Sequence, residues 1–172
     1  MKLRIISIGN KMPDWVETAC AEYIKRMPRE LSIEIVEVKP EKRAAGNSTE
    51  NIQAIEAKRL LEAAGDNFLI ICDENGQQLS TQALAEHMRS WQNGGENDNQ
   101  TIGKNISFII GGADGLHDSI KKLAKLQFGL SRLTLPHAFV RVLLCEQLYR
   151  AHTININHPY HRERRKILIY AI

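Results

Sequence analysis

Short apolar segments alternate with longer amphipathic segments along almost the whole chain of 172 residues. Branched and aromatic side chains in the short segments predict strands, and apolar side chains spaced three or four residues apart predict helices between them. The predicted strands cover residues 2–9, 32–38, 67–73, 105–110 and 128–136, and the predicted helices cover 14–27, 50–65, 80–92, 116–127 and 137–153. This alternation predicts an α/β domain with a mainly parallel sheet and helices on both faces.

The composition fits one ordinary globular domain covering residues 1–172. Hydrophobic residues make up 43% of the chain and charged residues 25%, and no apolar run is long enough to span a membrane. Cys20, Cys72 and Cys145 lie far apart, which favours reduced thiols over disulfides or a zinc site. The first residues also lack the features of a signal peptide, so we expect a cytoplasmic protein that does not bind membranes. A net charge of +3 permits an anionic partner without requiring one.

Ligands of parallel α/β sheets bind at the carboxyl ends of the strands. Three predicted strand ends carry unusual residues: Cys72 with Asp73, Gly111 with Gly112, and Leu135 with Pro136 and His137. The glycine turn at residues 111–115 can let a backbone approach a ligand closely, or it can be a turn that needs positive φ. Its spacing matches neither a dinucleotide fingerprint nor a phosphate loop.

Residues 131–136 close the last predicted strand, and two interpretations of them stay open. Their backbone donors and acceptors could surround an adenine or a ribose, or the strand could simply end at Pro136. The connector at residues 39–47 and the segment at 92–105 are predicted as polar surface loops.

The last predicted helix has an apolar face for a core or a subunit interface, made of Val140, Leu143, Leu144, Leu148 and Ala151. Arg141, Glu146 and Arg150 fall off that face, and we expect Glu146 and Arg150 to form a minor surface ion pair.

The stretch that follows this helix, from His158 to Glu163, is polar and interrupted by Pro159. The spacing of His158 and His161 invites a metal site, but no third ligand stands nearby, so no metal is predicted. The basic residues at 162–166, together with those at 11, 25, 26 and 29, could form a surface that contacts phosphates.

Four motifs occur in a familiar order: MKLRIISIGNKMPDWV, SFIIGGADGL, LSRLTLPHAFVRVLLCEQLYRA and NHPYHRE. Through them, residues 1–163 resemble the RlmH family of large-subunit ribosomal RNA pseudouridine N3-methyltransferases, a minimal branch of the SPOUT superfamily. The resemblance implies a homodimer and a deep trefoil knot at roughly residues 105–163. It also implies an enzyme that uses S-adenosylmethionine to methylate N3 of a pseudouridine in the 23S rRNA of assembled ribosomes.

The resemblance also implies the site residues. The methyl donor would contact residues that follow three of the strands, and the tail after the last helix would supply catalytic and RNA-contacting groups. The implied donor-binding residues are Cys72 (usually aliphatic in the family), Gly112, Ser131, Arg132, Leu133, Thr134, Leu135 and Pro136, and the implied catalytic residues are Tyr160, His161 and Arg162.

Two features depart from the family. The loop at residues 93–105 is longer than expected, and residues 164–172 extend the chain beyond the usual tail. Two other functions stay open at this point: a catalytically idle ribosome-associated RNA-binding protein, and a SPOUT methyltransferase that acts on tRNA.

Overall fold

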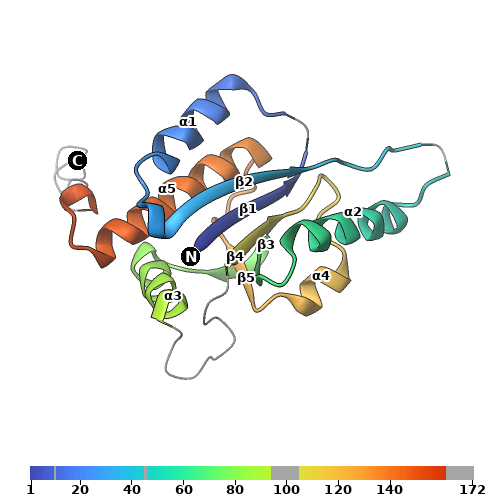
Figure 1. Cartoon of the computed structure of the whole chain (residues 1–172). Coiled ribbons are helices and arrows are strands. Elements are labelled where there is room, and N and C mark those ends of the chain that lie inside the picture. The colour runs from blue at the N-terminus through green and yellow to red at the C-terminus, as the bar shows by residue number, and fades with distance from the viewer. Residues whose placement is uncertain (10, 45, 94–104, 162–172) are drawn as a thin grey trace.

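A computed structural model describes residues 1–9, 11–44, 46–93 and 105–161 (Figure 1). Its centre is one sheet of five strands in the order β2-β1-β4-β3-β5, and every pairing between neighbours is parallel. The strands are β1 (Lys2–Ile8), β2 (Ser32–Val38), β3 (Phe68–Gln78), β4 (Ile106–Ile110) and β5 (Leu126–Gly129). The predicted parallel α/β architecture is confirmed.

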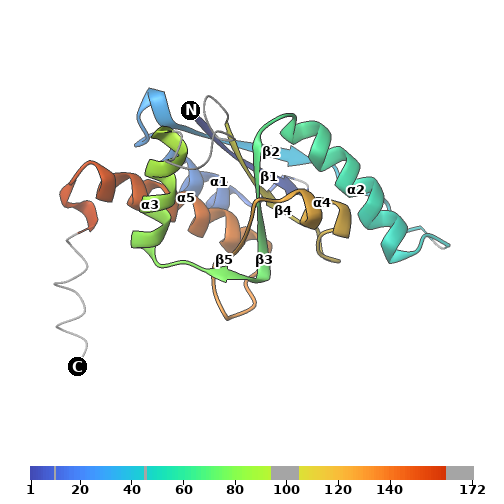
Figure 2. The ribbon, with the colours of Figure 1, turned by 90° about the horizontal axis from the view of Figure 1, so that it is seen from below.

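Helices cover both faces of this sheet, as Figures 1 and 2 show. One face packs against α1 (Asp14–Ile24), α3 (Thr81–Asn93) and α5 (His137–Asn155), and the other against α2 (Thr49–Ala64) and α4 (Asp118–Leu123). Alternate residues of β1 serve the two layers: Leu3 and Ile5 join the first core, whereas Ile6 and Ile8 join the second. Burial on both faces explains why all residues of β4 except Ser107 are apolar.

The helix boundaries follow local signals. Ser48 caps α2 by accepting a hydrogen bond from the Asn51 N–H at 3.2 Å, and Gly65 ends the helix with a φ of 59°. Pro136 precedes α5, where its missing N–H leaves no helical bond unmade. None of the described helices is long and apolar enough to cross a membrane.

Two element predictions are wrong near the end of the sheet. The strand predicted for residues 67–73 extends to Gln78 in β3, because a bulge lets Gln77 and Gln78 pair with β5. The helix predicted for 116–127 shrinks to the six residues of α4, because Leu126 and Gln127 form β5 instead. Residues 130–136 therefore follow the last strand as a loop, and do not close it.

A third prediction fails on α5. Arg141, Glu146 and Arg150 were expected off the apolar face, yet their side chains are buried. The helix is covered on several sides, by α1, by α3 and by the turn after its own end, so no broad polar face remains for them. Arg141 donates from Nη1 to the Glu37 carboxylate at 2.6 Å, and Arg150 forms an ion pair with Glu146.

Candidate active site

A cavity of about 610 Å³ opens at the carboxyl ends of β3, β4 and β5. This is the size range of cofactor sites, and the position is the one expected for ligands of a parallel sheet. Three stretches of chain contribute most of its wall. They are residues 72–75 at the bulge of β3, the turn at residues 110–116 after β4, and the loop at 130–135 after β5, joined by Gln53, Lys121, Phe128, His137 and Val140.

The floor of the cavity is apolar and includes the Cys72 thiol between the neighbouring strands. Cys72 lies in register with Ile110 on one side and Phe128 on the other. Burial raises the pKa of the Cys72 thiol to about 12, so it stays protonated at neutral pH. A protonated thiol is a poor nucleophile, which makes Cys72 a packing surface for a ligand and not a covalent catalyst.

The glycine turn forms one wall with its backbone. The Gly115 N–H donates to the Gly112 carbonyl at 3.0 Å, and Gly115 has a φ of 82°, which favours glycine. A Cβ on Gly112 would not enter the cavity: it would lie 3.0 Å from Glu56 Oε2 and 3.2 Å from Ile8 Cγ2, in the layer beneath. A Cβ on Gly112 would therefore crowd the packing of the turn on β1 and α2, and the glycine borders the cavity with its backbone.

The loop after β5 forms the opposite wall and leads into α5. The Ser131 hydroxyl accepts a hydrogen bond from the Leu133 N–H at 2.9 Å, which fixes the first bend of the loop. At the start of α5, burial and the nearby Arg141 cation lower the pKa of His137, so its imidazole is neutral at pH 7. Among the residues that the structure describes, the buried Nε2 of His137 has no hydrogen-bond partner.

Charged groups gather on the rim, at the bulge of β3. The Asp73 carboxylate accepts the Asn75 N–H at 2.9 Å and lies 3.9 Å from the Lys121 ammonium. The bulge depends on two glycines facing each other, since a Cβ on Gly76 would lie 2.7 Å from the Gly129 nitrogen. This tight backbone contact places the polar residues Asp73, Glu74 and Asn75 at the edge of the cavity, next to its apolar floor.

Tyr160 lies in η2 (Pro159–His161), away from this cavity. Its hydroxyl donates to Glu146 Oε1 at 3.3 Å, its ring lies 4.9 Å from the Tyr149 ring, and the Arg150 guanidinium stacks over it at 4.5 Å. Burial and the Glu146 carboxylate raise the pKa of Tyr160 to about 12. Tyr160 is therefore a neutral hydroxyl at pH 7, fixed by three residues of α5.

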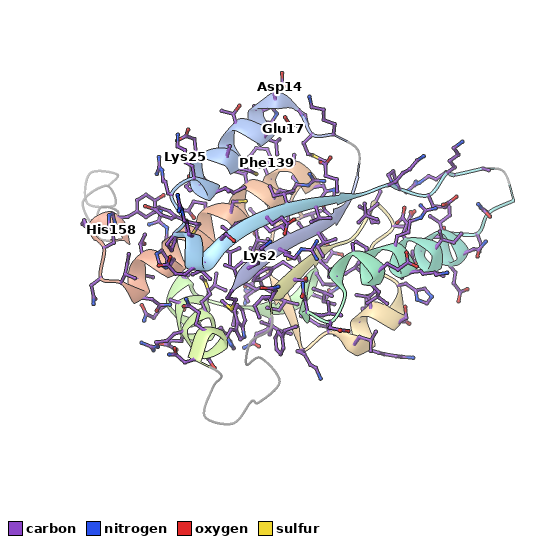
Figure 3. All side chains as sticks on the ribbon, viewed as in Figure 1. Lys2, Asp14, Glu17, Lys25, Phe139 and His158 are labelled. Carbon is purple, nitrogen blue, oxygen red and sulfur yellow. The ribbon has the colours of Figure 1, made fainter. Side chains whose placement is uncertain are left out.

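The cavity and Tyr160 occupy different parts of α5. His137 and Val140 of the first turn line the cavity, whereas Glu146 lies about 14 Å beyond His137, and about 9 Å beyond Val140, along the helix axis. Figure 3 shows the same separation: Phe139 near the start of the helix lies far from His158 just beyond its end. A single chain therefore does not bring Tyr160 to the cavity.

The structure thus gathers most of the predicted donor-binding residues. Cys72, Gly112, Ser131, Leu133, Thr134 and Leu135 all line one cavity, whereas Arg132 and Pro136 belong to the same loop without lining it. The side chain of His161 and the whole of Arg162 fall outside the described residues. Asp73, Gly111 and His137, which the predicted strand ends had marked for a candidate pocket, also border the cavity, although the family resemblance did not imply them. Glu74, Asn75 and Lys121 carried no such signal.

With this geometry established, the comparisons with known proteins are informative. Residues 1–161 match the model of a family described as predicted SPOUT methyltransferase. The chain belongs to this family. A protein from Methylobacillus flagellatus named ribosomal RNA large subunit methyltransferase H is 56% identical over 163 residues, which is 95% of this chain and 100% of the relative. Proteins of the same name from Neisseria meningitidis serogroup C and Nitrosomonas eutropha are 48% and 47% identical, over 95% and 94% of this chain and 100% and 99% of theirs.

A solved structure supports the fold alone. A probable methylase family protein from Haemophilus influenzae Rd KW20 aligns with a TM-score of 0.54 at 15% identity, covering 92% of this chain and 69% of that one.

Among the described residues, no three His, Cys, Asp or Glu side chains come together in a way that could hold a metal ion.

Proposed function

We propose that this SPOUT methyltransferase uses S-adenosylmethionine to methylate N3 of a pseudouridine in the 23S rRNA of assembled ribosomes. Support for an rRNA substrate comes from the relatives, whose names describe ribosomal RNA large subunit methyltransferases and which align over nearly their full length. The observation that carries the proposal is the cavity at the carboxyl ends of β3, β4 and β5, where six of the eight donor-binding residues implied by the family resemblance converge.

The residues of the cavity fit the proposed methyl donor. An apolar floor of Ile110, Phe128 and Leu130 can accept an adenine ring, and carboxylates such as Asp73 on the rim can accept hydrogen bonds from ribose hydroxyls. The backbone of the glycine turn and of the loop after β5 adds hydrogen-bond donors and acceptors. The bound donor supplies an electrophilic methyl group, and the protein contributes its orientation.

The proposed acceptor needs a base. N3 of a pseudouridine is a weakly acidic imide nitrogen that must lose its proton before it can attack a methyl group. Tyr160 cannot accept that proton, because its phenol is already protonated at neutral pH. We assign proton removal to His161 and stabilisation of the developing oxyanion to Arg162, since an imidazole titrates near neutral pH and a guanidinium keeps its charge.

The separation of Tyr160 from the cavity bears on the assembly. If the tail is catalytic, its groups act at the cavity of another subunit, because the cavity of their own subunit lies at the far end of α5. We therefore propose a homodimer in which the tail of each subunit completes the cavity of the other, with the trefoil knot expected in residues 105–163. Isologous dimers provide this exchange, because a contact made by one subunit is returned by the other.

A methyl-transfer assay tests the proposal. The protein and labelled S-adenosylmethionine are incubated with each of four substrates in parallel reactions: assembled ribosomes, separate ribosomal subunits, naked rRNA and tRNA. We expect label in the large-subunit RNA of assembled ribosomes, and a reverse-transcription stop at the modified base, since a methyl group on N3 blocks base pairing. Label confined to tRNA would contradict the proposed substrate, and failure to bind the donor would leave an idle RNA-binding protein.

A further inference from the structure

The connector between β2 and α2 starts with a basic segment that the reaction does not use. We call residues 39–44 the basic arm. It contains Lys39, Lys42 and Arg43, whose side chains are all exposed, and Glu41 as its one acid. In Figures 1 and 2 the connector extends past the sheet and leads into the start of α2, on the opposite side of the molecule from the end of α5.

The basic arm is fixed by hydrogen bonds at several points. Arg59 of α2 donates to the Lys39 carbonyl at 3.0 Å and forms an ion pair with the Glu41 carboxylate. The Glu41 N–H donates to the buried carboxylate of Glu56 at 3.0 Å. These contacts hold the backbone of the basic arm against α2, so its cationic side chains are presented from a defined surface.

The same contacts decide the charge that the basic arm shows to solvent. The Arg59 guanidinium neutralises Glu41, and its hydrogen bond lowers the pKa of that carboxyl. Within the described part of the chain, Lys39 and Lys42 have no carboxylate within ion-pair distance. The outward charge of the basic arm is therefore positive.

One residue connects the basic arm to the cavity. Arg43 donates from Nη2 to the Asp114 carboxylate at 2.7 Å, and Asp114 belongs to the glycine turn on the cavity wall. Gln53 donates to the carbonyl of the same residue at 2.5 Å, which fixes the junction from α2. Because β2 and β4 are parallel, their carboxyl ends meet at one edge of the sheet, so the basic arm and the cavity share that edge.

A second group of cations lies elsewhere and is already engaged. Lys25 and Arg26, near the end of α1, both form ion pairs with Glu22, and the Arg26 guanidinium stacks 5.9 Å from the centre of the Tyr149 ring. Their charges are partly used within the protein. Lys39 and Lys42 are therefore better placed to contact an external anion beside the cavity.

We infer that the basic arm binds the phosphate backbone of the RNA next to the target nucleotide. The inference rests on the proposed function and adds a docking surface to it. A nucleotide that enters the cavity carries flanking phosphates past its rim, on the side where Lys39 and Lys42 present exposed ammonium groups. Contacts of this kind position RNA without reading its sequence, and each one releases counterions.

The test compares a variant that lacks two positive charges of the basic arm with a control variant that lacks two positive charges far from the arm. The variant is Lys39→Gln with Lys42→Gln, and Arg43 is kept because it anchors the cavity wall. The matched control is Lys2→Gln with Arg89→Gln: Lys2 lies at the amino end of β1, the opposite edge of the sheet (Figure 3), and both side chains are exposed. Binding to assembled ribosomes is measured by sedimentation between about 50 and 200 mM salt.

The slope of log affinity against log salt should fall by about 1.4 to 1.8 in the arm variant and stay at the wild-type value in the control. The KM for ribosomes should rise with kcat unchanged, and calorimetry should show unchanged affinity for S-adenosylmethionine. A wild-type slope in the arm variant, or an equal fall of the slope in the control, would show that the basic arm is not a docking surface. The proposed function would still stand in that case, provided that the wild-type protein methylates ribosomal RNA. A wild-type protein that methylates no ribosomal RNA would overturn both.

Discussion

At the scale of single residues, Cys72 is the most direct probe of the cavity. Its half-buried side chain borders the cavity floor, and its thiol is protonated, so the residue contributes shape and apolar surface without reactivity. Gly112 is less suitable for this purpose. A side chain there would press on Ile8 and Glu56 and would damage packing before it reached a ligand.

Replacing Cys72 by phenylalanine should therefore block the donor. The larger ring has the open cavity on one side, and it should fill the floor where an adenine would pack. We expect Cys72→Phe to lower the affinity for S-adenosylmethionine at least about 100-fold in calorimetry, while thermal unfolding stays cooperative, because overpacking of about 1–3 kcal/mol is tolerated by most domains.

Cys72→Ala is the matched control for this change. It removes the thiol and leaves the cavity open, so its donor affinity should stay within about tenfold of the wild type. Equal donor affinity in the Phe variant and the wild type would mean that the donor binds elsewhere. A large loss in the Ala variant would give the thiol itself a role.

At the scale of elements, α5 joins the two halves of the proposed site. Its first turn lines the cavity, and its second half holds Tyr160 through a buried ion pair between Glu146 and Arg150. Burying two charges costs free energy that a surface pair would not, so the pair is better explained by the position it gives to the tail than by stability.

Variants of this ion pair separate stability from positioning. Arg150→Met leaves the Glu146 carboxylate buried without its cation and should cost about 3–5 kcal/mol in denaturant unfolding. Glu146→Leu combined with Arg150→Met should recover most of that loss, because both charges disappear together. The double variant should still lose about 10- to 100-fold in kcat with unchanged donor affinity, since Tyr160 loses its anchor.

The ion pair would be only structural if the double variant kept full activity. A loss of donor affinity in the double variant would instead show that the change spreads along α5 to the cavity. Both readouts need the folded protein, so each is measured at a temperature below the unfolding transition of the weakest variant.

The elements also show what the sequence could and could not predict. Periodicity predicted the five strands and the two-sided helical cover, because apolar runs such as β4 have no other stable environment. It missed the second half of β3, since the pairing of Gln77 with Phe128 depends on a close approach of Gly76 to Gly129 that is distant in sequence. It also placed Arg141 at the surface, because a helical wheel does not show how many neighbours will cover a helix.

The same reasoning applies to the candidate site. The strand ends indicated a pocket from the order of elements alone, since parallel strands place their carboxyl ends together. For residues 131–136 the sequence left two interpretations open, a ligand-binding loop and a plain strand end, and only the family resemblance favoured the first, because backbone groups leave no signature of side-chain chemistry. Lys121 reaches the rim through the fold of α4, and nothing in the local sequence marks it.

At the scale of the whole molecule, the distance between the tail and the cavity has a consequence for assembly. Tyr160 contacts Glu146, Tyr149 and Arg150 of α5, and the cavity wall contains no residue after Val140 among those that the structure describes. If two subunits exchange tails, each active site needs one intact cavity and one intact tail from different chains. Two inactive variants could then repair each other.

Mixing a tail variant with a cavity variant tests this exchange. His161→Ala with Arg162→Ala disables the tail, and Cys72→Phe disables the cavity, so each homodimer alone should be inactive. In a heterodimer, one site combines the intact tail with the intact cavity, and the other combines both defects. Random exchange puts about half of the molecules in heterodimers, so about a quarter of wild-type activity should return.

A tail that serves its own subunit gives a different result. Every site in every dimer would then carry one defect, and mixing would restore nothing. Native mass spectrometry of the mixture verifies separately that subunits exchange. As a second control, a mixture of Cys72→Ala with the tail variant shows the activity that an open cavity supports. Absence of recovery in the presence of proven heterodimers would rule out the shared site, because the intact tail and the intact cavity would be present in one molecule without working together.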